Sequence, residues 1–520
     1  MDPLIRSLMR PEAYPHPVER LELLETHISW VILTGPYAYK LKKPVDFGFV
    51  NFTTLERRER FCHEELRLNG RMAPDLYRAV VPVFGPREAA TLVGDGEPVE
   101  YAVQMQQFPH SALLPAALEE GRLQPEHLDR FAVELARFQR TAAVADGTQP
   151  FGDPDAVRAP IDGNFAVLTT LSEQAAAVRR LQDWSAAEFE RLRPVFVARK
   201  QSGRVREGHG DLHLGNMVLL NGVVQAFDGL EFNASLRWID VVSEVAFLVM
   251  DLQERGRPDL GARVLNHWLE ETGDYAGLAT WRWYFVYRAL VRAKVAALRL
   301  KQPELSADDA TQQHAEMANY LALAERWTQP RPTAVLITHG VSGTGKSVVS
   351  ERICERFGAV RMRSDIERKR LFGQWGDPVG PPLTGSLYAE SATDRVYRER
   401  LSGLVPHVLA AGFPVIVDAT FLRRELRDVF AELAARLKVP FVILDVRADL
   451  AVLRSRLLAR QQVGDDPSDA DACVLDQQLQ TCEPLTEAER RQAIEVRTDR
   501  AGWWNALASE LVSRSGLPGA

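Results

Sequence analysis

The side chains best suited to catalysis stand in one short polar stretch, residues 207–229 (EGHGDLHLGNMVLLNGVVQAFDG). Asp211 is a carboxylate that can accept or orient the proton of a substrate hydroxyl. Asn216 follows five residues later, and Asp228 stands near the end of the stretch. Amide and carboxylate oxygens are ligands for a hard cation, and Mg²⁺ held with a nucleotide is the usual occupant. The stretch therefore indicates phosphoryl transfer to a hydroxyl group.

An Asn-Gly pair in the same stretch predicts how these groups meet. Asn221–Gly222 separates the apolar runs VLL and VVQAF, which is the strongest local signal of a two-residue type I′ hairpin turn. The register of that hairpin places Asn216 opposite Phe227, which directly precedes Asp228. Because such cross-strand neighbours lie about 5–8 Å apart, we expect the amide and the carboxylate to reach one ion.

The two histidines of the stretch allow other interpretations. His209 and His213 have H-x-x-x-H spacing, which on a helix can bind zinc. Gly210 and Gly215 weaken a helix there, and the glutamate of the H-E-x-x-H motif is missing. We therefore favour phosphoryl transfer over zinc ligation. A further alternative is that both histidines are structural or solvated.

A second chemical motif begins at residue 340. The sequence fits G-x-x-x-x-G-K-[ST], directly after the apolar run TAVLIT and at the start of an amphipathic helix. Backbone amides of this motif surround phosphates, its lysine reaches the β and γ phosphates, and the following hydroxyl binds Mg²⁺. The predicted nucleotide-binding residues are Gly340, Ser342, Gly343, Thr344, Gly345, Lys346 and Ser347. Lys346 is also predicted to be catalytic, and Ser347 to bind the metal.

Charged residues farther along can complete this second site. Asp365 ends the run AVRMRSD, where it can orient a substrate hydroxyl, and Arg368 follows one helical turn later, where it can hold an anion. Alternatively, Asp365 is only a helix N-cap. Asp418 ends VIVDAT and is predicted to support Mg²⁺ or to contact substrate. Arg456 and Arg460 share one helix face, as in a lid that binds phosphates, or else they are solvated.

The two motifs belong to different frameworks, which meet at TQPRPT, residues 328–333. Its prolines cannot continue the Ala-rich helix before it, so we predict a linker there, between domains of residues 1–327 and 334–520. After the linker, five short apolar strands alternate with amphipathic helices, and their sequences are TAVLITHG, FGAVRMRSD, FPVIVDAT, VPFVILDV and AIEVRTD. This order predicts an α/β domain with a parallel sheet covered on both faces.

The first domain has a different order of elements. Two β-rich runs, residues 28–33 and 37–43, form a predicted hairpin. A charged helix (55–71) and further strands (79–84 and 100–108) follow, and the rest is mostly helical. A small sheet followed by a helical part predicts an α+β domain.

Composition limits the possible partners. The chain has 520 residues, 46% of them hydrophobic and 26% charged, which is typical of a globular protein. A net charge of −7 makes nucleic acid possible but not the default partner. Four scattered cysteines predict buried thiols in a reducing compartment. Because no signal peptide or membrane span is recognisable, we expect a cytoplasmic protein without membrane contact.

The first polar stretch resembles a known family. HGDLHLGN (209–216) followed by Asp228-Gly229 is similar to the phosphotransferase loop of the aminoglycoside phosphotransferase and choline kinase group, relatives of protein kinases that phosphorylate small molecules. The resemblance covers approximately residues 25 to 300. It implies a protein-kinase-like bilobal fold in which Asp211 is the base, while Asn216 and Asp228 hold Mg²⁺.

The same resemblance implies a phosphate-binding lysine and its partner. Lys40 on the run YAYK matches the kinase lysine that grips the α and β phosphates, and Lys42 on the same face is the alternative. Glu64 or Glu65 on the next helix is the ion-pair partner. We choose Glu64 because Leu68 follows four residues later.

Three further features bear on the first site. Met105 and Phe108, in the run MQQF after a strand, are predicted to form the hinge that meets adenine. Glu231, Asp240 and Glu244 lie where substrates of the group bind, and they favour a cationic substrate if they are exposed. The sequence departs from the kinase pattern before the first hairpin, because LELLETHIS contains no glycine-rich loop.

The second domain resembles small P-loop kinases over approximately residues 333 to 500. The D-x-x-R placement of Asp365 and Arg368 is similar to that of polynucleotide 5′-kinases, and the domain is also similar to gluconate kinases and zeta toxins. The chain is therefore predicted to be a bifunctional phosphotransferase that uses ATP and Mg²⁺. An alternative, favoured by the missing glycine loop, is that the first half is a nucleotide-sensing regulator. Neither acceptor is identified by the sequence.

Overall fold

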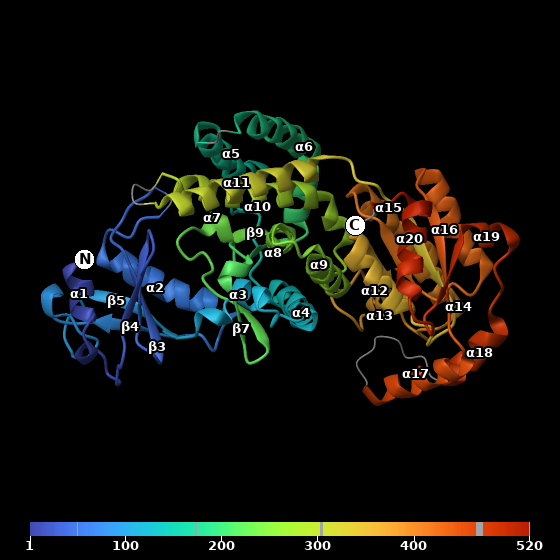
Figure 1. Ribbon diagram of the computed structural model, residues 1–520, viewed down its shortest axis with the longest axis horizontal. Helices are drawn as coiled ribbons and strands as arrows, with labels where there is room; N and C mark the ends of the chain where they lie inside the picture. Colours follow the sequence, from blue (N-terminus) through green and yellow to red (C-terminus); the bar gives the residue numbers. More distant parts are fainter. Residues whose placement is uncertain (49, 172–173, 302–304, 464–471, 519–520) are drawn as a thin grey trace. The chain divides into compact units, whose positions relative to one another are not determined.

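The computed structural model describes residues 1–48, 50–171, 174–301, 305–463 and 472–518 (Figure 1). The chain forms two compact units. Unit 1 comprises Met1–His127, Thr141–Pro160 and Phe196–Leu248, and unit 2 comprises Leu128–Arg140, Ile161–Val195 and Val249–Ala520. The helices that precede the predicted linker are therefore divided between the two units.

Unit 1 is built on a five-stranded antiparallel sheet with the strand order β1-β2-β3-β5-β4. The strands are β1 (Glu22–Glu25), β2 (Ser29–Leu33), β3 (Tyr37–Lys42), β4 (Tyr77–Val83) and β5 (Glu100–Gln106). Helix α2 (Leu55–Asn69) packs against β4 and β5 (Figure 1). The predicted hairpin, charged helix and later strands are confirmed, whereas β1 was not predicted.

Two short antiparallel pairs hold the polar stretch of unit 1. β6 (Val205–Glu207) pairs with β9 (Trp238–Asp240), and β7 (Met217–Leu220) pairs with β8 (Val223–Ala226). The turn between β7 and β8 is Asn221–Gly222, with φ angles of 51° and 74°. Two successive residues in the left-handed region are what a type I′ turn requires, so the predicted hairpin is confirmed.

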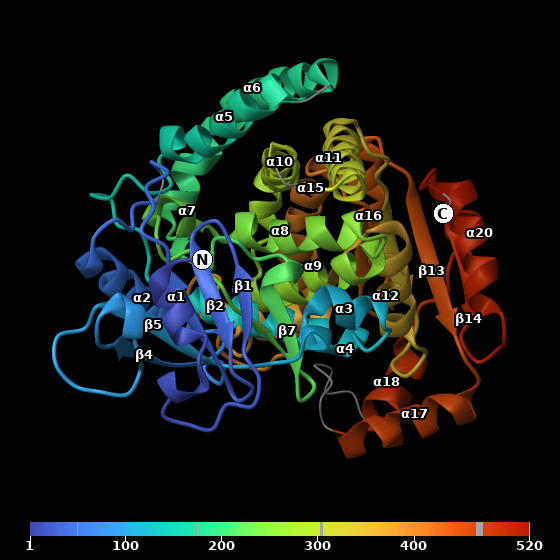
Figure 2. The ribbon, with the colours of Figure 1, turned by 60° about the vertical axis from the view of Figure 1, so that its left-hand side comes forward.

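The remaining helices before residue 328 belong partly to unit 1 and partly to unit 2. They are α1 (Pro3–Leu8), α3 (Leu114–Glu119), α4 (Pro125–Thr141), α5 (Pro154–Leu171), α6 (Ala175–Gln201), α7 (Ala234–Arg237), α8 (Val241–Glu254), α9 (Pro258–Thr272), α10 (Trp281–Arg299) and α11 (Ala307–Thr328). In both views α10 and α11 lie side by side (Figures 1 and 2). Within the described ranges, no helix has the length and apolar character needed to cross a membrane.

The second motif stands on a five-stranded sheet in unit 2, with all its strands parallel and the order β11-β12-β10-β13-β14. The strands are β10 (Val335–His339), β11 (Val360–Arg363), β12 (Val415–Asp418), β13 (Phe441–Arg447) and β14 (Ala493–Arg497). All five were predicted. Their carboxyl ends meet at one edge of the sheet, which is where open α/β sheets bind ligands.

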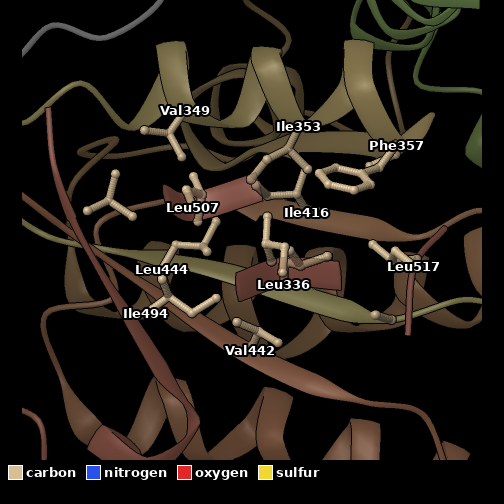
Figure 3. Close-up of a cluster of buried hydrophobic side chains, with 14 of the residues drawn as sticks. Leu336, Val349, Ile353, Phe357, Ile416, Val442, Leu444, Ile494, Leu507 and Leu517 are labelled. Carbon is tan, nitrogen blue, oxygen red and sulfur yellow. The ribbon is translucent and has the colours of Figure 1, made fainter. Parts of the chain in front are cut away.

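Helices cover both faces of this sheet. They are α12 (Lys346–Phe357), α13 (Ser364–Leu371), α14 (Glu390–Asp394), α15 (Ser402–Ala410), α16 (Arg424–Leu437), α17 (Leu450–Val463), α18 (Ala472–Thr481), α19 (Glu487–Gln492) and α20 (Trp503–Ser515). Figure 2 shows α20 beside β13 and β14. Val349, Ile353 and Phe357 of α12 point onto Leu336 and Ile416 of the sheet (Figure 3).

The face of the parallel sheet opposite α12 is covered as well. Val335 and Ile337, on either side of Leu336 in β10, are also fully buried, and α15 and α16 contact the same central strands. A strand buried on both faces is typical of a parallel sheet. The antiparallel sheet followed by helices and the parallel sheet covered on both faces thus confirm the predicted α+β and α/β parts.

Candidate functional site

Asp211 and Asn216 lie together in the loop between β6 and β7. The amide nitrogen of Asn216 donates to the carboxylate of Asp211 (2.9 Å) and to its backbone carbonyl (3.0 Å). These bonds use the nitrogen of the amide, so its oxygen is the atom suited to a cation. The Asp211 side chain is 30% exposed, which leaves it accessible to a substrate hydroxyl.

The β7–β8 hairpin brings Asn216 and Asp228 to the same end of the pair. The amide of Phe227 donates to the carbonyl of Asn216 (2.9 Å), which confirms the predicted register. Asp228 has a φ of 61°, and its amide donates to the hydroxyl of Tyr77 (3.1 Å). The Asp228 side chain is 45% exposed. An accessible carboxylate and an amide oxygen at one end of a hairpin are a donor set that fits Mg²⁺.

A buried ion pair connects the sheet to Asp228. The ammonium group of Lys40 on β3 donates to Glu65 (2.8 Å) and also to the carboxylate of Asp228. Burial alone would lower the pKa of Lys40, but the carboxylates of Asp228 and Glu65 raise it well above its ordinary value. Lys40 therefore stays charged, as a phosphate-binding lysine must.

The partner of Lys40 is Glu65, so the choice of Glu64 was wrong. Glu65 is fully buried on the face of α2 that meets the sheet. Glu64 instead pairs with Arg67 (2.7 Å) and Arg237 (2.8 Å). Consecutive helix residues point about 100° apart, so only one of the two glutamates can face β3.

Lys42, the alternative to Lys40, belongs to a second buried pair. Its ammonium group donates to the other oxygen of Glu65 (2.7 Å) and to Glu231. Burial alone would raise the pKa of Glu65, but the two lysines lower it to about 2. The side chain of Lys40 is 13% exposed and that of Lys42 only 1%, which favours Lys40 as the lysine that binds phosphates.

The three acidic residues would favour a cationic substrate only if they were exposed, and this condition is not met because all three are buried. Glu231 pairs with Lys42. Asp240 accepts two hydrogen bonds from the guanidinium of Arg199 (2.5 and 2.7 Å). Glu244 accepts hydrogen bonds from the backbone amides of residues 209 and 210 (2.5 and 3.1 Å). Glu244 therefore holds the loop backbone at residues 209 and 210, and none of the three carboxylates is free to face a substrate.

The two histidines are held by the same loop. His209 Nε2 lies 2.9 Å from the carbonyl of Phe227, and burial lowers the pKa of His209. The Nδ1 atom of His213 accepts a hydrogen bond from the amide of Gly215 (3.1 Å). Within the part of the chain that the structure describes, no three His, Cys, Asp or Glu residues gather as a metal site. The zinc interpretation gains no support.

The region predicted to meet the nucleotide base is apolar. Met105 and Phe108 belong to one hydrophobic cluster with Val218 and Phe227, and the rings of Phe108 and Phe227 lie 5.5 Å apart. An apolar lining is typical of small-molecule sites, and contact with adenine stays a prediction. The connection between β1 and β2 is only three residues long, Thr26–Ile28, so it is too short to form a loop like the kinase glycine-rich one.

In unit 2 the predicted phosphate-binding loop joins β10 to α12. Gly340, Gly343 and Gly345 have φ angles of 139°, 86° and 91°. A Cβ atom at Gly340 would lie 2.4 Å from the carbonyl oxygen of Val446, so this position requires glycine. In this structure the amide of Ser342 donates to the side chain of Gln478 on α18 (2.7 Å).

The loop forms one wall of a cavity of about 200 Å³. The predicted residues along the cavity are Ser342, Gly343, Gly345, Lys346, Ser347, Asp365, Asp418 and Arg456. Arg363 and Thr420 line it as well and were not predicted. Asp418 accepts a hydrogen bond from Ser350 (3.0 Å), and Arg456 donates to the carbonyl of Gly343 (3.2 Å). The site thus combines cations, hydroxyls and carboxylates around a phosphate-sized space.

Asp365 is not the N-cap of α13, because the cap residue is Arg363 and its side chain makes no capping bond. Arg368 does not line the cavity. Its guanidinium donates to the carbonyl of Leu387 (2.9 Å) and to Thr393 (3.2 Å), so its contact with a substrate anion gains no support here and stays a prediction. Arg460 lies on α17, but its side chain is outside the described residues.

Helix α9 supports this site from within unit 2. Arg361 on β11 donates to Glu270 of α9 (2.7 Å), and its guanidinium lies 3.5 Å from the carbonyl of Ser347. The backbone amide of Arg361 donates to Asn266 of α9 (2.6 Å). The side chains of Arg361, Glu270 and Asn266 are all buried. Sequence patterns could not show this support, because α9 precedes the predicted linker.

Comparisons with known proteins give one family model and several similar solved structures. The family model described as "AAA domain" matches residues 335–485. Among solved structures, the chain is similar to a choline/ethanolamine kinase family protein from Mesorhizobium loti, with 13% identity, a TM-score of 0.35 and coverage of 62% of this chain and 98% of that one. It is also similar to a gluconokinase from Sinorhizobium meliloti 1021, with 24% identity, a TM-score of 0.24 and coverage of 36% and 99%.

One curated relative is much more similar in sequence. The uncharacterized protein Rv2004c of Mycobacterium tuberculosis is 32% identical over 456 residues, which cover 86% of this chain and 88% of that protein. The alignment is longer than either predicted domain, so it includes parts of both. The chain therefore belongs to the protein family of Rv2004c.

Proposed function

We propose that the chain is a bifunctional phosphotransferase that uses ATP and Mg²⁺ in two separate sites. Each half would transfer the γ-phosphate to a hydroxyl of a small molecule or of a nucleic-acid 5′ end. The observation that supports this proposal is that Lys40, Asp211, Asn216 and Asp228 fall in unit 1, whereas Lys346, Ser347, Asp365 and Asp418 fall in unit 2. We place the halves at residues 1–327 and 334–520, with a linker at 328–333, and the protein in the cytoplasm.

In the first site, Lys40 binds the nucleotide phosphates through its charged ammonium group. Glu65 holds that group in position from inside the protein. Asn216 and Asp228 would hold Mg²⁺, which neutralises phosphate charge when bound. Asp211 accepts or orients the proton of the acceptor hydroxyl as the new phosphorus–oxygen bond forms.

In the second site, the amides of the phosphate-binding loop and the ammonium group of Lys346 hold the phosphates. Ser347 and Asp418 would hold the Mg²⁺ ion. Asp365 lies on the wall of the same cavity, where it can orient an acceptor hydroxyl, and Arg456 adds a positive charge beside the loop. A phosphate group that enters the loop must replace Gln478 at the amide of Ser342.

A second candidate function is a P-loop kinase whose first half only senses nucleotide. Two observations favour it: the short Thr26–Ile28 connection offers no glycine-rich cover for phosphates, and Lys40 contacts Asp228 directly. In that case the first half would bind ATP without transferring phosphate.

Transfer of label from γ-labelled ATP to a metabolite and oligonucleotide extract tests both candidates. The proteins are the wild type, Asp211→Ala and Lys346→Ala, with Asp95→Ala and Lys301→Ala as controls at exposed positions. We expect each active-site variant to lose one set of labelled products and both controls to keep all products. Labelled products that are all lost in Lys346→Ala and all kept in Asp211→Ala would favour the regulatory function. An absence of all labelled products would contradict both.

A further inference from the structure

Three reactive side chains lie together next to the phosphate-binding loop but outside the cavity that it lines. His339, the last residue of β10, is the cross-strand neighbour of Asp445 on β13. Its Nδ1 atom lies 2.9 Å from a carboxylate oxygen of Asp445. The sulfur of Cys482, just after α18, lies 3.9 Å from the Nε2 atom of the same ring. Topology thus orders a thiol, an imidazole and a carboxylate in a row.

The environment of His339 suits a base that becomes charged. Burial alone would lower its pKa, but the hydrogen bond to Asp445 and the proximity of Cys482 raise it above its ordinary value. Asp445 also accepts hydrogen bonds from Arg447 on the same strand (2.9 Å), and its own pKa is lowered despite its burial. A carboxylate at Nδ1 fixes the ring and leaves Nε2 to face the sulfur.

The other described thiols have no such partner and give a comparison inside the same chain. Cys62 and Cys354 are buried, as predicted, and burial raises the pKa of each to about 12. Cys482 is only partly buried, so the expectation of a buried thiol is wrong for it. A cysteine becomes reactive when it is accessible and next to an imidazolium.

We propose that Cys482 is a modification site, a nucleophilic thiol next to the His339 ring that hydroperoxides oxidise to a sulfenic acid. The thiol proton moves to Nε2 of His339, and the sulfur attacks one oxygen of the peroxide. A sulfur–oxygen bond forms while the oxygen–oxygen bond breaks. The leaving oxygen takes the proton from His339, so hydrogen peroxide yields Cys482–SOH and water. Sulfur is oxidised by two electrons and the peroxide is reduced by two.

The proposal does not depend on phosphotransfer and is tested by trapping the sulfenic acid. The full chain is treated with hydrogen peroxide at pH 6.5 in the presence of dimedone, and the adduct is measured over time by mass spectrometry. The tryptic peptide 461–490 contains both Cys473 and Cys482, so all proteins carry Cys473→Ser. The variants are His339→Gln, Asp445→Asn and, as a blank, Cys482→Ser.

We expect the adduct on Cys482 to form about ten times faster in the parent than in His339→Gln. A free thiol is about 1% ionised at pH 6.5, and the roughly hundredfold gain from full ionisation is reduced about tenfold by the weaker nucleophilicity of a more acidic thiol. The adduct rate of Asp445→Asn should lie between these two rates, because this change weakens the hold on the His339 ring without removing the ring.

The buried thiols of Cys62 and Cys354 show whether a variant has unfolded, which distinguishes unfolding from the proposed effect of His339. Cys62 and Cys354 should stay unlabelled in every variant, and a variant in which they react is replaced by one that keeps them protected. Equal rates in the parent, His339→Gln and Asp445→Asn would overturn the proposal, as would a Cys482 that reacts no faster than free cysteine at the same pH.

Discussion

Replacing Glu65 by glutamine tests the assignment of the buried ion-pair centre in unit 1. Glu65 is fully buried and contacts both Lys40 and Lys42. Removing one partner of a buried ion pair costs about 3–5 kcal/mol. Each lysine keeps a second carboxylate, on Asp228 and Glu231, and glutamine can still accept one hydrogen bond. We therefore expect a loss of about 2–3 kcal/mol in the stability of this region, below the full value.

Hydrogen exchange measured by mass spectrometry can read this loss locally. Peptides from α2 and β3 should exchange about 30 to 160 times faster in Glu65→Gln, since about 1.4 kcal/mol corresponds to a factor of ten. Glu64→Gln is the matched control, because its side chain is 24% exposed and its arginine partners also contact Glu207. A partly exposed pair contributes about 1 kcal/mol or less, so exchange should rise about fivefold at most. Equal acceleration in the two variants would refute the assignment.

Three further results are expected. Because the pKa of Glu65 is lowered to about 2, its stabilisation is complete above about pH 5 and is lost as the pH falls from about 4 to 2, which an acid titration of exchange in α2 would detect. Gly340→Ala should lower nucleotide affinity in unit 2, measured by calorimetry, by tenfold or more, because a Cβ would meet the carbonyl of Val446. Gly516 also has a positive φ but lies in open space, so Gly516→Ala should leave this affinity unchanged. Glu270→Gln should weaken nucleotide binding in unit 2 severalfold in the same calorimetric titration. It removes the negative charge that orients Arg361 behind the phosphate-binding loop.

Local patterns were sufficient for the elements that hold the two sites. The Asn221–Gly222 turn needs two residues with positive φ, and few other residue pairs allow this. The strands of unit 2 are continuous apolar runs because both of their faces are buried. In each case the property that defines the element lies in the residues themselves, so no distant contact had to be known.

Residues whose role depends on distant partners could not be placed in this way. The buried face of α2 consists of Arg58, Cys62, Glu65, Leu68 and Asn69, three of them polar, so hydrophobic periodicity did not identify it. Asp240 is buried by Arg199, 41 positions away. The edge strand β1 is mostly exposed and has charged residues at both ends, so it carries no alternating pattern. Such features follow from tertiary contacts and are absent from local sequence.

The number of nucleotides bound per chain tests the central claim of two separate sites most directly. Isothermal titration with a non-hydrolysable ATP analogue and Mg²⁺ should give two equivalents for the wild type and one each for Lys40→Met and Lys346→Ala. A single equivalent for the wild type, or two for Lys346→Ala, would contradict the account.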